Sequence, residues 1–207
     1  MDSSRANVIK VGILTVSDSS FRGTDHPEKG TRLRDTITSI QSAKCSVDIL
    51  DFVPDEIEQI KAKLVEWSDF LQLDVILTTG GTGFAARDVT PEATKLVLEK
   101  EAPGMTLAML KGSLDITPLA MLSRLVCGTR NKSLIINLPG NPNGAAECFQ
   151  LVWPGIPHAV DLLRGHNGSV EKTHETLQAE GIQHSGFTRS TCKQQHSCIG
   201  QNLHSDL

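Results

Sequence analysis

The sequence predicts an α/β protein with three layers: a doubly wound, mostly parallel sheet that carries one antiparallel strand, with helices on both faces. Two observations support this prediction. Short apolar runs rich in β-branched residues alternate with segments of helical period along most of the chain. Alternation at this spacing is typical of parallel strands joined by helices, which cover both faces of the sheet. A predicted hairpin near residues 128–132 supplies the antiparallel strand.

Each strand is predicted from an apolar run that ends at a polar or glycine-rich turn. The helices between them are predicted from their period and their first residues. An amphipathic helix is expected over 31–42. A second begins at Pro54 and Asp55, and a third has Thr90 as its N-cap and Pro91 at its first position. A long helix is expected over about 143–164. The expected strands are 8–16, 45–53, 73–79 and 133–139, and the apolar face of the second helix holds Ile57, Ile60, Leu64, Trp67 and Leu71.

Composition excludes several classes of protein. No apolar run reaches the roughly 18 residues that a membrane helix requires, and the first residues lack the apolar region of a signal peptide. A formal net charge of −4 argues against a dedicated nucleic-acid binder. We therefore expect a cytoplasmic protein whose five cysteines are reduced.

The composition changes near residue 167. From there to residue 207 the chain is rich in Ser, Thr, Gln, Gly and His, and its few apolar residues follow no period. We predict a folded domain over 6–166 and a flexible, linker-like tail over 167–207. A Cys-His-Cys cluster in the tail lacks a recognised zinc spacing, so we expect no metal site there.

Polar and glycine-rich segments follow four of the expected strands. The carboxyl ends of parallel strands meet at one edge of an open sheet, where such folds bind their ligands. We therefore expect these segments to form one site. They are Ser17-Asp18, Pro54-Asp55-Glu56, Thr79-Gly80-Gly81-Thr82-Gly83 with Arg87-Asp88, and Pro139-Gly140-Asn141-Pro142.

The glycine-rich segment is a candidate phosphate loop. Gly80, Gly81 and Gly83 allow backbone conformations that point consecutive N–H groups at an oxyanion, and Thr79 and Thr82 add hydroxyl donors. The segment is neither a Walker A loop nor a G-x-G-x-x-G fingerprint. An ordinary turn after a strand remains the alternative interpretation.

Asp55 and Asp88 are the candidate catalytic acids and Mg²⁺ ligands. A carboxylate pair beside a nucleotide holds Mg²⁺ through one or two oxygens while phosphates supply others. The alternatives are a first-turn acid for Asp55 and a turn cap for Asp88. Arg87 would neutralise Asp88, contact a phosphate, or lie solvated on the surface.

A proline-flanked turn precedes the last long helix. Pro139 and Pro142 stiffen the turn around Gly140, and Asn141 stands just before the helix, where an anion is favoured. A well-made strand-to-helix turn is the alternative. Ser113 and Ser123 lie in the 104–123 segment and could reach the same edge of the sheet. No G-x-S-x-G motif occurs, which argues against a serine nucleophile.

Taken together and in order, these motifs resemble the MogA/MoaB family of molybdenum-cofactor enzymes. Over residues 8–166 the chain is most similar to the amino-terminal G domain of gephyrin and its counterparts. The resemblance covers about three quarters of the chain. The matching segments are TVSDS, VPDE, TTGGTG, RDVTPEAT, EAPGM, MLSR and NLPGNP.

The resemblance implies an activity and a set of roles. Such domains use Mg-ATP to adenylylate molybdopterin and release pyrophosphate. Asp55 and Asp88 would be the catalytic acids, and Thr82, Ser123 and Asn137 would line the pocket for the pterin phosphate. On the nucleotide side would lie Ser17 and Asp18, the glycine loop, and the Pro139–Pro142 turn.

The resemblance also implies partners: a homotrimer and a MoeA-like domain or protein that inserts molybdate. A scaffold role, in which gephyrin-like proteins cluster receptors beneath the postsynaptic membrane or bind the cytoskeleton, remains an alternative or additional function. The chain ends in a segment of linker-like composition. A MoeA-like domain following residue 207 would favour the scaffold role. A pterin carrier without catalysis is a third interpretation.

Overall fold

The computed structural model describes residues 8–23, 28–39 and 45–166. The predicted tail over 167–207 lies outside these residues, as do the first two residues of the predicted domain. Within the described part of the chain, no helix is both long enough and apolar enough to cross a membrane.

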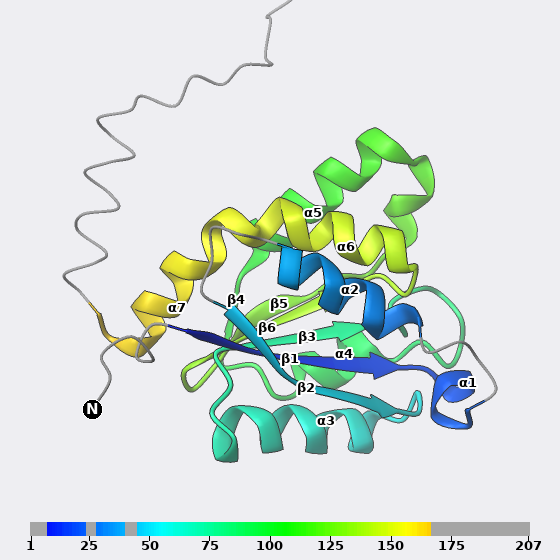
Figure 1. Cartoon of the computed structure of the whole chain (residues 1–207). Helices are drawn as coiled ribbons and strands as arrows, with labels where there is room; N and C mark the ends of the chain where they lie inside the picture. The colour runs from blue at the N-terminus through cyan, green and yellow to red at the C-terminus, as the bar shows by residue number, and fades with distance from the viewer. Residues whose placement is uncertain (1–7, 24–27, 40–44, 167–207) are drawn as a thin grey trace, which may run out of the picture.

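In the described part of the chain, six strands form one mixed sheet in the order β2-β1-β3-β6-β5-β4 (Figure 1). The neighbours from β2 to β6 are parallel, while β5 runs antiparallel to both β6 and β4. The structure thus confirms the predicted fold class, including its single antiparallel strand. The strands are β1 (Ile9–Val16), β2 (Cys45–Val53), β3 (Val75–Thr79), β4 (Lys100–Glu101), β5 (Cys127–Arg130) and β6 (Ser133–Leu138).

Helices cover both faces of the sheet (Figure 1). One face packs against α2 (Glu28–Ser39), α5 (Pro103–Ile116), α6 (Pro142–Val152) and α7 (Ile156–Arg164). The other packs against α3 (Ile57–Val65), the π-helical turn η1 (Glu66–Phe70) and α4 (Thr90–Lys95). The remaining short elements are α1 (Asp18–Phe21) and the 3₁₀ turns η2 (Pro118–Leu122) and η3 (Trp153–Gly155).

The core consists of two apolar clusters, one on each face. Residues of β1 contribute to both clusters: Val11 and Ile13 pack in the first, whereas Leu14 and Val16 pack in the second. Gly12 lies beneath Trp67, where a Cβ atom would come within 2.8 Å of the indole ring. A glycine is required there because the ring packs directly on the strand.

Four helices differ from their predicted bounds. The helix expected from Pro54 and Asp55 begins later, at Ile57. The helix expected over 143–164 is interrupted by η3, since Pro154 has no N–H to donate to the preceding turn. The helix expected from 31 begins earlier, at Glu28. The third helix has Val89 as its N-cap, so Thr90 is its first residue. Leu71, predicted on an apolar helix face, is 43% exposed beyond the end of η1.

The strand order reverses beside β1, which pairs with β2 on one side and β3 on the other. The loops that leave β1 and β3 diverge to opposite faces, and a crevice forms at the carboxyl ends of such a pair. This topology brings the four polar loops to one edge of the sheet.

Candidate active site

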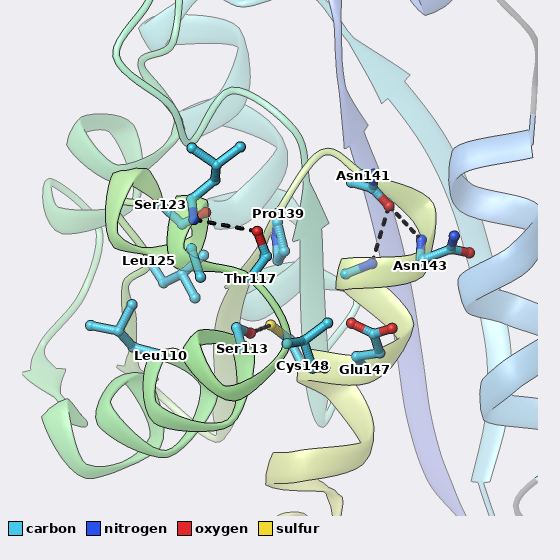
Figure 2. Close-up of a pocket in the computed structure, with 14 residues that line it drawn as sticks. Leu110, Ser113, Thr117, Ser123, Leu125, Pro139, Asn141, Asn143, Glu147 and Cys148 are labelled. Carbon is cyan, nitrogen blue, oxygen red and sulfur yellow. Dashed lines mark hydrogen bonds between the residues drawn. The ribbon is translucent and has the colours of Figure 1, made fainter.

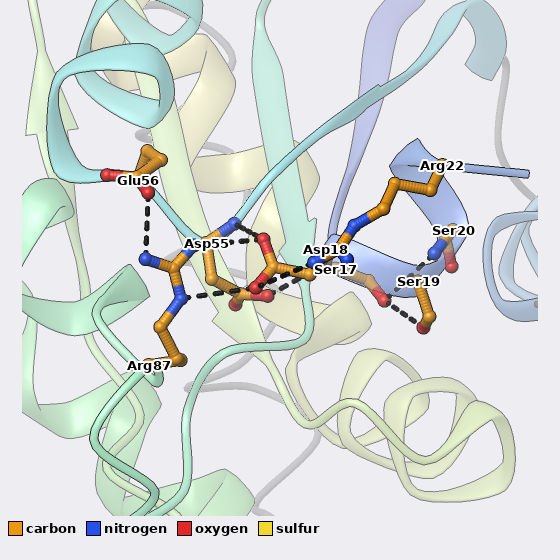
Figure 3. A network of polar contacts seen from close by, with 8 residues as sticks. All are labelled: Ser17, Asp18, Ser19, Ser20, Arg22, Asp55, Glu56 and Arg87. Carbon is orange, nitrogen blue, oxygen red and sulfur yellow. Dashed lines mark hydrogen bonds and ion pairs between the residues drawn. The ribbon is translucent and has the colours of Figure 1, made fainter. Parts of the chain in front are cut away.

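Asp18 and Asp55 join the loops that follow β1 and β2 through two reciprocal hydrogen bonds (Figure 3). The Asp18 N–H donates to Asp55 Oδ2 at 2.9 Å, and the Asp55 N–H donates to Asp18 Oδ1 at 3.2 Å. This reciprocal pair fixes both side chains. Helix α3 begins only at Ile57 with Glu56 as its N-cap, so the alternative of Asp55 as a first-turn acid is wrong.

Arg87 joins three loops at the same edge. Its guanidinium donates twice to Asp18, at 3.1 and 3.0 Å, and once to Glu56 at 2.7 Å (Figure 3). The pairing with Arg87 lowers the pKa of Asp18. In this structure the carboxylates that Arg87 pairs with are those of Asp18 and Glu56 rather than that of Asp88. A small cavity of about 220 Å³ opens beside Asp55, Glu56 and Arg87.

The glycine loop depends on backbone conformations that side chains rarely adopt. Gly80 has a φ of 106° and Gly81 a φ of 60°. A Cβ atom on Gly81 would lie 2.8 Å from Asp55 Oδ1, so the loop runs directly against that carboxylate. Thr90 also holds the loop, since its Oγ1 donates to the Gly80 carbonyl at 2.9 Å.

Asp88 closes the far end of this loop. Its Oδ2 accepts the Ala85 N–H at 3.0 Å, and a Cβ atom on Gly83 would lie 2.8 Å from that oxygen. The capping contact considered from the sequence is therefore present. Among the described residues, the second carboxylate oxygen of Asp88 accepts no hydrogen bond. This oxygen can therefore bind a cation while the first one caps the turn.

The two acids suit a hard cation such as Mg²⁺. Each has one oxygen held by a backbone N–H, which orients the other, and carboxylate oxygens are preferred ligands of Mg²⁺. Within the described residues no group of three or more acidic, His or Cys side chains could hold a metal by itself. A cation here would need ligands from phosphates and water, as Mg²⁺ in nucleotide sites commonly has.

Burial raises the pKa of Asp55, and the nearby charges of Asp18 and Asp88 raise it further, although the Asp18 N–H opposes them. A raised folded-state pKa means that ionised Asp55 destabilises the fold at neutral pH. This penalty declines as the pH falls through the folded-state pKa and is absent below the unfolded-state pKa.

We therefore expect Asp55→Asn to unfold at a higher temperature than the unmodified chain at pH 7. Asparagine keeps an acceptor for the Asp18 N–H and carries no charge. The difference in melting temperature should shrink as the pH falls through the raised pKa. Thermal unfolding followed by circular dichroism between pH 4 and 8 measures it. A lower melting temperature at pH 7 would contradict this account of Asp55.

A larger cavity of about 460 Å³ lies between η2, α5 and the start of α6 (Figure 2). Four predicted site residues line it: Ser113, Ser123, Pro139 and Asn141. Asn141 is the N-cap of α6, and its Oδ1 accepts the N–H groups of residues 143 and 144 at 2.9 and 3.2 Å. The wall also contains Leu110, Leu119, Leu125, Glu147 and Cys148.

Two predicted site residues lie inside the protein. Asn137 is fully buried, and its amide donates to Thr78 and Thr94 at 2.8 and 2.9 Å, on the face of the sheet that α4 covers. Thr79 is also fully buried, and its hydroxyl donates to the Pro139 carbonyl at 2.8 Å. These side chains stabilise the carboxyl ends of β3 and β6 through hydrogen bonds.

The other predicted residues shape the loops. Ser17 caps α1 by accepting the Ser20 N–H. Thr82 is 4% exposed, and its carbonyl accepts the Arg124 N–H. Gly140 packs against Gly80: a Cβ atom on Gly140 would lie 3.3 Å from the Gly80 Cα. Pro142 is the first residue of α6.

Two contacts at the site were not predicted. Glu56, named from the sequence only as part of its loop, pairs with Arg87, and Arg124 contacts the glycine loop. A signal for Arg124 was present, since it is a lone basic residue in a largely apolar stretch directly after Ser123. Its partners lie 36 and 41 residues away in sequence, and no local pattern reveals them.

The glycine loop, Asp55 and Asp88 lie where the strand order reverses beside β1. Doubly wound α/β proteins bind their ligands at this position, and the chain is a protein of this class. Residues 12–158 match the model of a "Probable molybdopterin binding domain". The chain belongs to this family.

Curated relatives agree with this assignment. Over 158 residues the chain is 41% identical to molybdopterin adenylyltransferase from Helicobacter pylori, covering 76% of this chain and 89% of that protein. It is also 41% identical over 174 residues to gephyrin from Dictyostelium discoideum, covering 80% of this chain. The match spans only 24% of gephyrin.

A solved structure has the same fold. The molybdopterin biosynthesis enzyme MoaB from Thermus thermophilus superposes with a TM-score of 0.71 at 45% identity, covering 76% of this chain and 97% of that one. The observed sheet is therefore the fold of this family.

Proposed function

We propose that the chain is a molybdopterin adenylyltransferase, which joins the adenylyl group of ATP to the terminal phosphate of molybdopterin. The observation that carries this proposal is the apolar cavity with polar residues at its rim, on the same sheet edge as the glycine loop and the two acids. The likeness to the bacterial enzyme along 89% of its length supports it.

The pterin would occupy the larger cavity. Its volume of about 460 Å³ falls in the range typical of small-molecule sites. The leucine side chains of the wall would contact the ring system, while Ser113, Ser123 and Asn141 provide polar atoms. The N-terminus of α6 lies at the edge of this cavity, where its dipole favours the terminal phosphate.

ATP would bind at the edge formed by the glycine loop, Asp18 and Asp55. In the reaction an oxygen of the pterin phosphate forms a bond to the α-phosphorus of ATP. The bond between the α-phosphorus and its bridge to the β-phosphate breaks, and pyrophosphate leaves. The attacking phosphate is already an anion, so no strong base is required. This agrees with a site built for positioning and charge stabilisation.

Both substrates are polyanions, and the carboxylates of Asp18, Asp55 and Glu56 outnumber the guanidinium groups of Arg22 and Arg87 (Figure 3). A divalent cation would therefore be needed to neutralise the phosphates. Asp55 and Asp88 would hold Mg²⁺, and when bound the ion would stabilise the charge that develops on the phosphoryl oxygens.

The apolar surface of α5 and η2 supports a homo-oligomer, and we propose the trimer implied by the family resemblance. Four side chains on these elements are more than 60% exposed: Leu107, Ile116, Leu119 and Met121. Contiguous apolar patches mark protein interfaces, and α5 and η2, which carry these side chains, pack against each other. A MoeA-like domain or protein would then receive the adenylated product.

The decisive experiment supplies the purified chain with ATP, Mg²⁺ and molybdopterin. We expect stoichiometric release of pyrophosphate and formation of adenylated molybdopterin, with no release when molybdopterin or Mg²⁺ is omitted. A pterin carrier would bind molybdopterin, detected by its fluorescence, and release no pyrophosphate.

The match to gephyrin favours a second role as one part of a larger scaffold. Ile116 and Leu119 of the exposed apolar surface also line the larger cavity, so an interface that covers them would lie beside the proposed pterin site. Activity of the chain alone would show that the enzymatic function does not require the rest of such a protein.

A further inference from the structure

Arg124 stands between the two halves of the proposed site. It directly follows Ser123, which lines the larger cavity, and its side chain extends to the loop of residues 82–88, which ends at Asp88. Its side chain is 32% exposed.

The guanidinium binds both ends of that loop at once. Its Nε donates to the Gly83 carbonyl at 2.8 Å, and its Nη2 donates to the Asp88 carbonyl at 2.6 Å. The Arg124 backbone N–H adds a third bond, to the Thr82 carbonyl at 2.9 Å. The remaining nitrogen, Nη1, pairs with the carboxylate of Glu92 on α4. Only a planar fork of donors can make these side-chain contacts together.

Burial cannot hold the loop in place. Residues 84–87 are all exposed, and Phe84 at its tip is 69% exposed. A segment with few apolar contacts opens locally at low free-energy cost unless hydrogen bonds restrain it. The contacts from Arg124, the turn within residues 85–88 and the Arg87 ion pairs are the restraints that the structure describes. Of these, the Arg124 contacts link the loop to the wall of the cavity.

We propose that Arg124 is a positioning residue for adenylyl transfer: by binding the Gly83 and Asp88 carbonyls, it fixes the carboxylate of Asp88 relative to a pterin phosphate in the cavity. The inference rests on the proposed function. It predicts that Arg124 affects the rate of the chemical step more than it affects pterin binding.

The first test compares Arg124→Lys with Glu92→Gln. Lysine keeps the positive charge beside Glu92 but cannot donate to both carbonyls in the same geometry. Glu92→Gln removes the ion pair and keeps the carbonyl contacts. We expect Arg124→Lys to lower kcat about 10- to 100-fold, as a misplaced catalytic group does. KM for molybdopterin should change less than about threefold, and Glu92→Gln should stay within about threefold of the unmodified chain in both parameters.

The second test requires no substrate. In hydrogen exchange followed by mass spectrometry, Arg124→Lys should speed exchange in residues 82–90 while β6 exchanges as before. Unchanged exchange in residues 82–90, or equal acceleration in β6, would overturn the inference. If the unmodified chain releases no pyrophosphate, the proposed function fails, and the exchange result still decides whether Arg124 holds the loop.

Chemical rescue distinguishes the loss of the guanidinium contacts from a general folding defect. In Arg124→Ala, millimolar guanidinium should restore part of the lost kcat, because a free guanidinium ion can occupy the vacated position and donate to the same carbonyls. The same addition should leave Glu92→Gln and the unmodified chain unchanged. Failure of rescue in a folded Arg124→Ala variant would contradict the positioning role.

Discussion

Replacing Asp88 with asparagine is expected to lower the rate of pyrophosphate release by about 10²- to 10³-fold, the loss typical when a preorganised electrostatic contact in a site is removed. Asparagine has nearly the same shape as aspartate, and its Oδ1 can still accept the Ala85 N–H that Asp88 accepts at 3.0 Å. The turn should therefore persist while the charge near the phosphates is lost. Binding of molybdopterin should change little, because Asp88 does not line the larger cavity.

Single-turnover measurements with saturating ATP and molybdopterin would isolate this effect from substrate binding. Asp48→Asn is the matched control: Asp48 is exposed on β2 near the amino end of the strand, away from the glycine loop. The control should retain full activity, and both variants should unfold near the temperature of the unmodified chain. Activity of Asp88→Asn within threefold of the unmodified chain would remove Asp88 from the catalytic machinery.

The sequence was most informative about the buried strands. The predicted bounds of β2 agree with those observed, and β1, β3 and β6 differ from theirs by at most two residues at either end. These strands have continuous or alternating apolar runs because they pack between two helical layers. β4 was not predicted, since its two residues, Lys100 and Glu101, are both exposed and have no apolar pattern.

Two helices were not predicted for physical reasons. α5 exposes Leu107, Leu114 and Ile116 as well as burying Met109, so its apolar residues do not define one face. α1 has four residues and none of them is buried. Such a helix is stabilised by the Ser17 cap and by the hydrogen bonds between Asp18 and Asp55, and not by an apolar face that the sequence would show as a periodic pattern.

The site was predictable as a set of loops but not as a network of contacts. Its loops follow strands, and the rule for parallel sheets brings those loops together. The contacts within the site join residues far apart in sequence: Arg87 is 69 residues from Asp18, and Arg124 is 41 residues from Gly83. No local pattern determines which arginine meets which carboxylate or carbonyl. The family resemblance places Asn137 in the phosphate pocket, whereas in the structure its amide donates to Thr78 and Thr94 inside the protein.

Gly80→Ala is expected to destabilise the fold by about 2–4 kcal/mol, a loss typical of a side chain forced into a strained backbone position without space for it. The φ of 106° at Gly80 is unfavourable for alanine, and the new Cβ would lie 2.2 Å from the Val16 carbonyl oxygen. That oxygen belongs to β1, which pairs with strands on both sides, so it cannot move without disturbing the sheet. The loop would have to shift instead, which would disturb its contacts with Asp55 and with the Thr90 hydroxyl that binds it.

Chemical denaturation would measure this loss, and Gly104→Ala provides the matched control. Gly104 lies in the first turn of α5, and a Cβ atom there would meet nothing within 4 Å. Alanine favours a helix over glycine by about 1 kcal/mol at interior positions and by less at the ends, so the control should be neutral or slightly stabilised. If both variants unfold at the same denaturant concentration as the unmodified chain, the loop does not require a glycine at position 80. If only Gly80→Ala is destabilised and also loses adenylyl transfer under native conditions, the strained turn both supports the sheet and sets the position of the phosphate loop.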